Sequence, residues 1–304
     1  MGKANLNNTA YEERLGTDRM LPLVLRMAMP SVAAQIVNLL YNLVDRIYIG
    51  HIPGIGTDAL AGIGVTGAII ILISAFSAIV SGGGAPLAAI ALGQGDRKRA
   101  GQTLGNGFVL LLIFTLLTTT LTYLFMEPLL MFTGASENTV GYAKDYLSIY
   151  LLGTLFVETS VGLNTFINTQ GRPAIAMYSV LIGAVLNIIL DPIFIFVMGM
   201  GVRGAALATV ISQACSALWI VSFLTSKRAS LRLEFRYMRP DRNVISHILA
   251  LGVSPFIMAS TESLVGFVLN SSLEKFGDIN VSALAIMQSA MLVVSVPLAG
   301  FAQG

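Results

Sequence analysis

Charged residues and cysteine are scarce in this chain, and several common catalytic motifs are absent from it. Only 11% of the 304 residues are charged, against roughly 25% in soluble domains. The single cysteine, Cys215, excludes a disulfide framework and a thiolate metal site within the chain. The sequence has no GxxxxGK(S/T) phosphate-binding loop and no HExxH zinc motif, and His51 and His247 stand alone. Neither a single-chain ATP-driven pump nor a zinc protease is supported.

Long apolar runs dominate the sequence instead. Hydrophobic residues make up 55% of the chain and its mean hydropathy is +0.78. About 20 consecutive apolar residues suffice for a helix to cross a bilayer, so the sequence predicts an all-α polytopic membrane protein. Gly82–Gly84 and Pro86 interrupt the second run, which we expect to form one bent or interrupted helix. The expected spans are residues 23–49, 58–92, 103–126, 142–168, 174–198, 203–224, 244–273 and 281–303.

Basic residues are unevenly divided between the two ends of these spans. If the N-terminus is cytoplasmic, 14 of the 18 Lys and Arg residues fall on the cytoplasmic side. Membrane proteins carry such an excess in their cytoplasmic loops. We therefore expect a multi-pass protein of the plasma (inner) membrane with a cytoplasmic N-terminus. The net charge of +2 gives no support to a nucleic-acid partner.

A polar, basic segment, residues 225–243, divides the chain into two parts with related patterns. When Pro30 is aligned with Pro255, Asp45 falls opposite Asn270. Two complete copies at this spacing would need about 450 residues, arranged as parallel repeats like those of some secondary transporters. We therefore expect a fragment of a longer protein. The expected parts are a cytoplasmic N-terminal segment 1–22, a six-helix lobe 23–224, a cytoplasmic linker 225–243 and the first two helices of a second lobe 244–304.

The second lobe is expected to be incomplete in this chain. Ser260, Glu262 and Ser263 would face helices that the sequence does not supply. Polar groups left facing lipid are costly, and alternating access needs two lobes. We expect the last two helices to pack loosely or on the wrong face, and the 304-residue chain to insert without transporting.

Asp191 lies in the middle of an otherwise uncharged apolar run. A carboxylate inside a membrane helix costs roughly 2.5–3.5 kcal/mol on insertion scales, so such residues usually have a function. Asn187 precedes it by one helical turn, and Pro192 follows it and cannot donate to the carbonyl of Ile188. A small cation could use the carboxylate, the amide and this carbonyl together. The competing interpretation is a buried structural Asp capped by its neighbours.

Polar residues also follow single faces of several expected helices. Those of the first span are three or four positions apart, which places them on one face. They are Gln35, Asn38, Asn42 and Asp45. The fifth span repeats the pattern in steps of four with Ser179, Gly183, Asn187 and Asp191. Such stripes can join helices, but two stripes centred on carboxylates indicate a water-filled pocket.

Three stretches of the sequence resemble the multidrug and toxic compound extrusion (MATE) transporters. They are NLLYNLVDRIYIG around Asp45, ALGQGDRKRA after the second span, and NTQGRPAIAMYSVLIGAVLNIILDPIFIFVMGMGVRGAALATVISQ. The third is the most specific, because it runs through a loop and two whole helices. The resemblance implies twelve helices in two six-helix lobes around a central cleft.

The resemblance also implies roles for individual residues. Asp45, Asn187, Asp191 and Thr209 match the cation or proton site of the first lobe, where Na⁺ is the metal ion that could bind. Asn164 matches a further polar position of that pocket, and Glu262 an acidic position of the seventh helix. Pro30 matches the proline at which the first helix bends, and Pro192 is a second candidate hinge. The candidate substrate or cleft residues are Gln35, Asn38, Asn42, Asn164 and Glu262.

The resulting hypothesis is a secondary antiporter that exports amphipathic, mostly cationic drugs or toxins in exchange for Na⁺ or H⁺. It implies no cofactor apart from the coupling ion, the lipid bilayer and small organic cations as partners, and a monomer when the chain is complete. The closest alternative is a lipid-linked oligosaccharide flippase of the same superfamily, whose cleft would need cationic residues for the pyrophosphate. A major facilitator transporter and an intramembrane enzyme are more distant alternatives.

Overall fold

The computed structural model describes residues 20–277, 279–280, 282–284, 286–288, 290–291 and 295. Within these residues the protein is all-helical, as the composition predicts. The segment 1–22 and the expected eighth span, 281–303, lie largely outside the described residues. Six helices or runs of helices among the described residues are long and apolar enough to cross a membrane. The chain is therefore a multi-pass membrane protein.

Each of the first seven expected spans coincides with one helix or with a run of consecutive helices. The first four are covered by α2 (Met20–Gly50), then α3 (Gly56–Ile79), η1 (Val80–Gly84) and α4 (Ala85–Gly93), then α5 (Arg97–Leu124), and α7 (Val140–Asn168). The next three are covered by α8 (Pro173–Pro192) with η2 (Ile193–Val197), α9 (Val202–Thr225) and α10 (Arg242–Glu274). Two short elements were not expected, α6 (Met126–Phe132) and the 3₁₀ turn η3 (Phe235–Tyr237).

The second span is a continuous helical rod rather than two helices. Its middle, η1, is a π-helix of sequence VSGGG, and α4 follows it without a loop. A π-turn adds one residue to the turn and weakens it locally. The three glycines therefore interrupt the α-helical winding without ending the helix.

Local sequence signals set the helix ends at the loops. Gly95 has a positive φ of 75° after α4, and the Asp96 side chain then accepts a hydrogen bond from the Arg99 N–H at the start of α5. Asp241 caps α10 in the same way, and Pro173 stands in the first turn of α8. Short polar side chains at N-caps and proline in the first turn are the usual helix start signals.

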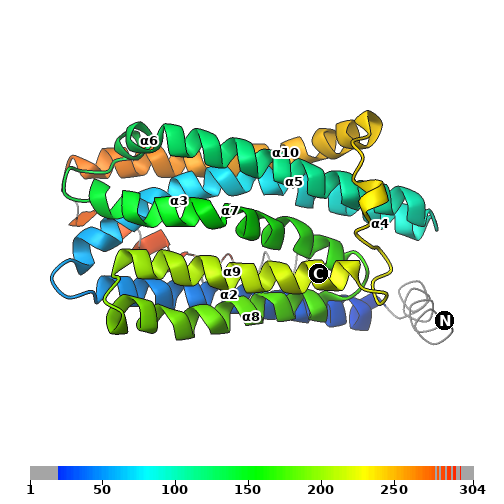
Figure 1. The fold of residues 1–304 in the computed structure, drawn as a ribbon, viewed down its shortest axis with the longest axis horizontal. Coiled ribbons are helices and arrows are strands. Elements are labelled where there is room, and N and C mark those ends of the chain that lie inside the picture. The colour runs from blue at the N-terminus through cyan, green and yellow to red at the C-terminus, as the bar shows by residue number, and fades with distance from the viewer. Residues whose placement is uncertain are drawn as a thin grey trace.

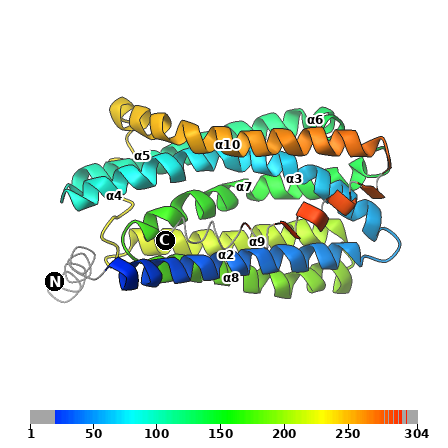
Figure 2. The same cartoon turned by 180° about the vertical axis from the view of Figure 1, so that it is seen from behind.

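The helices form two layers with α7 between them (Figures 1 and 2). One layer contains α2, α8 and α9, and the other contains α3, α5 and α10. The central helix α7 contacts α9 and α8 on one side and α3 and α5 on the other. Residues that project from α7 can therefore interact with both layers.

The α10 helix packs closely on α3 and η1, so loose packing, one of the two expected outcomes, is wrong for this helix. A Cβ added at Gly83 would overlap the carbonyl oxygen of Ile248, and one added at Gly252 would overlap the carbonyl oxygen of Ile79. Small residues allow membrane helices to approach this closely. The sequence prediction missed the contact because the two glycines are far apart in the chain.

The polar residues of α10 were expected to lack partners, and this is wrong for Ser263. Its hydroxyl donates a 2.6 Å hydrogen bond to the carbonyl oxygen of Ala68 on α3. The Ser260 hydroxyl is buried without a hydrogen-bond partner, and Glu262 is exposed. Ser263 differs from the other two because its side of α10 rests on α3.

Candidate ion and ligand site

The α8 helix brings Asn187 and Asp191 together because they are four residues apart on one face. The Asn187 Nδ2 donates a 3.2 Å hydrogen bond to Asp191 Oδ1 and lies 3.5 Å from the Thr209 Oγ1 of α9. Asn187 is 1% exposed and Asp191 is fully buried. Three of the four residues expected to form the cation site are thus in direct contact.

Asp45 joins this cluster from α2. A side-chain hydrogen bond connects its carboxyl group to that of Asp191. A hydrogen bond between two carboxyl groups requires a proton on one of them, because an ionised carboxylate only accepts. Repulsion between two close carboxylates is also relieved by a bound cation. The polar faces of α2 and α8 therefore meet at a place suited to a positive charge.

Several oxygen atoms of the cluster are buried without a hydrogen-bond donor. These are Asp45 Oδ1, Asn187 Oδ1 and Asp191 Oδ2. Carboxylate and amide oxygens are ligands for hard cations, whereas transition metals prefer nitrogen and sulfur. The described residues contain no group of three or more His, Cys, Asp or Glu side chains placed to hold a metal ion. The donor set fits a proton or Na⁺, while the ion-binding role itself stays a prediction.

Two tyrosines complete the surroundings of the carboxyl pair, and the sequence analysis missed both. A side-chain hydrogen bond joins Tyr146 of α7 to Thr209. Tyr41 of α2 is hydrogen-bonded to Gln213 of α9 and interacts electrostatically with Asp45. Aromatic residues in apolar helices usually belong to the core, so composition gave no reason to select them. The i, i+4 spacing of Tyr41 and Asp45 was the available signal.

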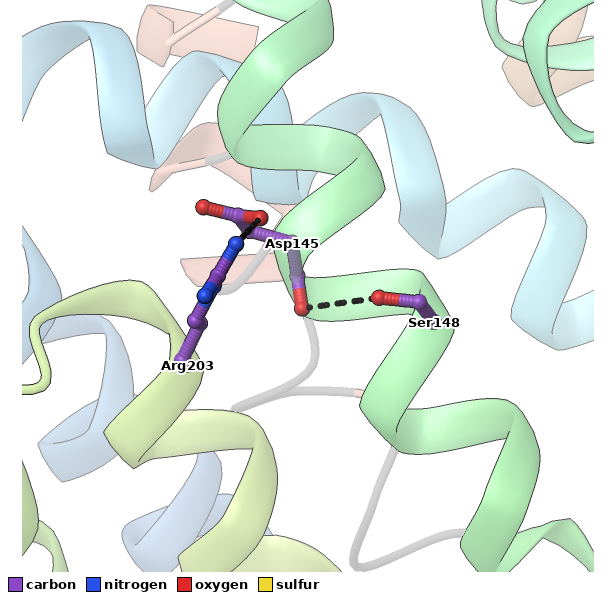
Figure 3. A network of polar contacts seen from close by, with 3 residues as sticks. All are labelled: Asp145, Ser148 and Arg203. Atoms are coloured by element: carbon purple, nitrogen blue, oxygen red, sulfur yellow. Dashed lines mark hydrogen bonds and ion pairs between the residues drawn. The ribbon is translucent and has the colours of Figure 1, made fainter.

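An ion pair joins α7 and α9 near their N-terminal ends (Figure 3). The Arg203 Nη2 lies 2.8 Å from Asp145 Oδ1, and the Ser148 hydroxyl donates to the Asp145 carbonyl oxygen at 3.4 Å. The Arg203 side chain is 62% exposed, so the pair contributes little stability. It links the start of α7 to the start of α9 at the surface.

A cavity of about 240 Å³ lies among α2, η1, α7, α8 and α9. Three of the expected substrate residues, Gln35, Asn38 and Asn164, line it. Tyr41 and Gln213, which are hydrogen-bonded to each other, also line it and connect it to the carboxyl pair. None of the described lining residues is charged. The cavity is therefore an uncharged polar chamber adjoining an acidic site.

The neighbourhood of Asn164 shows how the cavity wall is built. The Asn164 Nδ2 donates to the Ser179 hydroxyl at 2.7 Å and to the Ala176 carbonyl oxygen at 3.2 Å. The Ser216 hydroxyl of α9 donates to the Ser179 carbonyl oxygen at 2.7 Å. These bonds join α7, α8 and α9 through polar side chains around the open space.

The other expected site residues lie outside the cavity. Asn42 is exposed, and its Nδ2 donates to the Asn38 carbonyl oxygen of its own helix. Glu262 is exposed on α10, on the other layer of the bundle. Pro30 is inside α2, and Pro192 ends α8 where the π-helix η2 begins. Helical spacing predicted the face of Asn42 but not the fold-back of its side chain.

Comparisons with known proteins show the family of the chain. The MatE family model matches residues 30–193, which include both carboxyl residues. The chain is 25% identical to the multidrug export protein MepA of Staphylococcus haemolyticus (strain JCSC1435) over 281 residues, covering 92% of this chain and 62% of that protein. It spans less than two thirds of the length of this relative.

Solved structures show the same fold. The MATE multidrug transporter DinF-BH superposes with a TM-score of 0.90 at 32% identity, covering 96% of this chain and 65% of that one. The outward-facing conformation of a multidrug resistance MATE family transporter superposes with a TM-score of 0.82 at 28% identity, covering 92% and 62%. With the family model matching more than half of its residues, the chain belongs to the MatE family of membrane transporters.

Proposed function

We propose that this chain forms the ion-binding lobe of a secondary antiporter that exports amphipathic, mostly cationic compounds in exchange for H⁺ or Na⁺. The observation that carries the proposal is the hydrogen-bonded meeting of the Asp45 carboxyl group with that of the fully buried Asp191. Ionisable residues inside membrane segments usually mark ion or substrate pathways. Because the two carboxyl groups come from α2 and α8, binding of an ion between them can change the relative position of these helices.

The coupling ion would be held by Asp45, Asn187, Asp191 and Thr209. Binding of a positive charge favours the arrangement in which α2 and α8 bring their carboxyl groups together. A ligand can shift a conformational equilibrium only through such a difference in affinity. Because Pro30 removes one backbone hydrogen bond inside α2, the movement of α2 is expected to occur at this residue.

The exported compound would bind in the polar chamber beside this site. Gln35, Asn38 and Asn164 line it, and they can accept hydrogen bonds from an organic cation without binding it irreversibly. DinF-BH is described as a multidrug transporter and MepA as a multidrug export protein. Both relatives support a drug as the exported compound.

The lipid-linked oligosaccharide flippase receives less support. A pyrophosphate needs Arg or Lys side chains for recognition, and no described residue that lines the cavity is basic. We further propose a plasma-membrane protein with a cytoplasmic N-terminus, because most Lys and Arg residues then face the cytoplasm. Its partners would be the bilayer and small organic cations, and the complete protein would act as a monomer.

The proposal is tested by drug efflux from cells or vesicles that contain the protein at the full length of its relatives. The Na⁺ and H⁺ gradients are collapsed separately. We expect efflux to stop with one of the two gradients, which identifies the coupling ion. Efflux that continues without either gradient would contradict the antiporter. The 304-residue chain, measured in parallel, is expected to insert without efflux.

A further inference from the structure

A third carboxyl group is buried in the bundle, away from Asp45 and Asp191. Glu158 of the central helix α7 is 3% exposed. Its Oε1 accepts a 3.1 Å hydrogen bond from the Ser74 hydroxyl of α3, and its Oε2 accepts one from the Ser77 hydroxyl. It does not line the cavity. The described contacts therefore give Glu158 two hydroxyl partners and no place in the proposed ion site.

Both hydroxyl partners suit either protonation state of Glu158. A serine hydroxyl can donate to a carboxylate or accept from a carboxylic acid, whereas Arg and Lys only donate. Ser77 also lies 3.4 Å from the backbone carbonyl oxygen of Glu158. When the carboxylic acid donates to Ser77, the serine proton can turn to this carbonyl. Neither form of Glu158 leaves a buried polar group unpaired, which would be costly.

The charged residues of the neighbouring elements are concentrated at helix ends. The described residues of η1 and α4 carry no charge. Asp191 of α8 belongs to the proposed ion site. The remaining charged residues of the packed elements are Asp58 at the start of α3, Arg97, Lys98 and Arg99 at the start of α5, Glu127 on α6, Lys144 and Asp145 near the start of α7, and Arg203 at the start of α9. Glu158 is in the middle of its helix instead.

Two tyrosines lie between Glu158 and the proposed ion site. Tyr146, Tyr150 and Glu158 follow one another along α7 at intervals of four and eight residues. Tyr150 lies near Glu158 and near Tyr146. The rings of Tyr146 and Tyr150 are stacked with centroids 6.1 Å apart. Tyr146 in turn is hydrogen-bonded to Thr209 and interacts electrostatically with Asp45.

We propose that Glu158, held by Ser74 and Ser77, is a second proton-binding site of this lobe, coupled to the Asp45–Asp191 pair along the adjacent side chains of Tyr150 and Tyr146. The ligand is a proton rather than a metal ion, because the two serines supply the donors and acceptors that a carboxyl group needs and Glu158 does not line the described cavity. Coupling between two sites is reciprocal. The coupling half of this proposal rests on the proposed ion site, whereas proton binding by Glu158 does not.

Infrared difference spectroscopy tests the site without any transport assay. The purified chain is reconstituted in lipid, and the carbonyl stretch of protonated carboxylic acids is followed through a pH titration. We expect a titrating band that Glu158→Gln removes and that Glu127→Gln leaves unchanged. Glu127 is the matched control because its exposed side chain pairs with Lys144 at the surface. If the Glu158→Gln variant keeps every titrating band of the parent protein, the proposal is overturned.

The coupling is read from the same band in other variants. Asp45→Asn with Asp191→Asn should shift its midpoint, and Tyr150→Phe should keep the band. An unchanged midpoint in the double variant would overturn the coupling. If Glu158→Gln does not fold, Ser77→Ala takes its place and should shift the midpoint by removing one hydroxyl partner. An unchanged midpoint in Ser77→Ala would likewise overturn the site. Neither result depends on efflux. Failure of the Glu158 site can therefore be distinguished from failure of the antiporter proposal.

Discussion

The α8–α9 side of the bundle and the α3–α10 side use small residues for opposite purposes. Between α8 and α9, Gly183 faces the Ser216 hydroxyl, and both residues line a cavity of about 240 Å³. Where α10 meets α3 and η1, Gly83 and Gly252 let backbone meet backbone. Small residues on the first side leave room for polar side chains, while those on the second side let the helices touch.

This contrast separates ligand chemistry from packing within one lobe. Substitutions on the α8–α9 side should alter polar side chains that can adjust. Those on the α3–α10 side meet main-chain atoms, which cannot move without shifting a helix. Glycine alone is therefore poor evidence for function, and its role depends on whether its neighbour is a side chain or main chain.

The largest expected effect is on the ion side. Asp45→Asn and Asp191→Asn should each abolish gradient-dependent efflux by the full-length protein, because the amide cannot exchange a proton or neutralise a cation. Insertion should be unchanged, since removing a buried charge relieves its desolvation cost. Drug accumulation and membrane yield are measured together. Asp145→Asn, at the exposed ion pair with Arg203, is the control that should retain efflux. If Asp45→Asn or Asp191→Asn retains full efflux, the substituted Asp has a structural role only.

On the packing side, Gly83→Ala should destabilise the protein by about 1–3 kcal/mol, the usual cost of overpacking. The added Cβ would overlap the Ile248 carbonyl oxygen. Gly67→Ala is the matched control, because nothing lies within 4 Å of a Cβ at that position of α3. It should be neutral or stabilise the helix by up to about 1 kcal/mol. Thermal unfolding of purified variants in detergent distinguishes them, and equal stability would show that α10 does not pack as described.

A smaller effect is expected between α8 and α9. A Cβ at Gly183 would lie 2.5 Å from the Ser216 Oγ, so Gly183→Ala should displace the bond from Ser216 to Ser179. The expected cost is about 0.5–1.5 kcal/mol, the net worth of one hydrogen bond. Adding Ser216→Ala should relieve the overlap, so the double variant should be more stable than the two single costs predict. Additive costs in this double-mutant cycle would contradict the contact.

The smallest effect is expected at the surface. Arg203→Ala should change stability by no more than about 1 kcal/mol, because its ion pair with Asp145 is exposed. The difference from the parent protein should shrink further at high salt, which screens exposed charges. Melting temperatures at low and high salt provide the measurement. A loss larger than that of Gly83→Ala would reverse the order proposed for the two sides.

The sequence predicted those parts of the site that follow helical periodicity. The spacing of Asn187 and Asp191 placed them on one face of their helix. Asp45 lies on the polar face of the first span, which we expected to meet that face. The structure brings all three together with Thr209. A carboxylate in an apolar run is a strong signal because its burial is costly.

Contacts between distant helices could not be predicted in the same way. Tyr146 reaches Thr209 from another helix, and Ser77 reaches Glu158 across 81 positions. Tyrosine and serine are common in membrane helices, so neither residue stood out by composition. The contact of Gly83 with α10 was missed for the same reason. Periodicity identifies the face of a helix, but it does not identify the helix that this face meets.

The three consecutive glycines of η1 have a mechanical consequence. In a linker such a run would give a flexible joint, but here each glycine has its own neighbour. A Cβ at Gly82 would meet Pro255 of α10, one at Gly83 would meet Ile248 of the same helix, and one at Gly84 would meet Phe166 of α7. The second span is therefore clamped to α7 and α10 at its least α-helical point. When the lobe changes shape, these three helices should move as one body, and the strain should fall on the helices around the cavity.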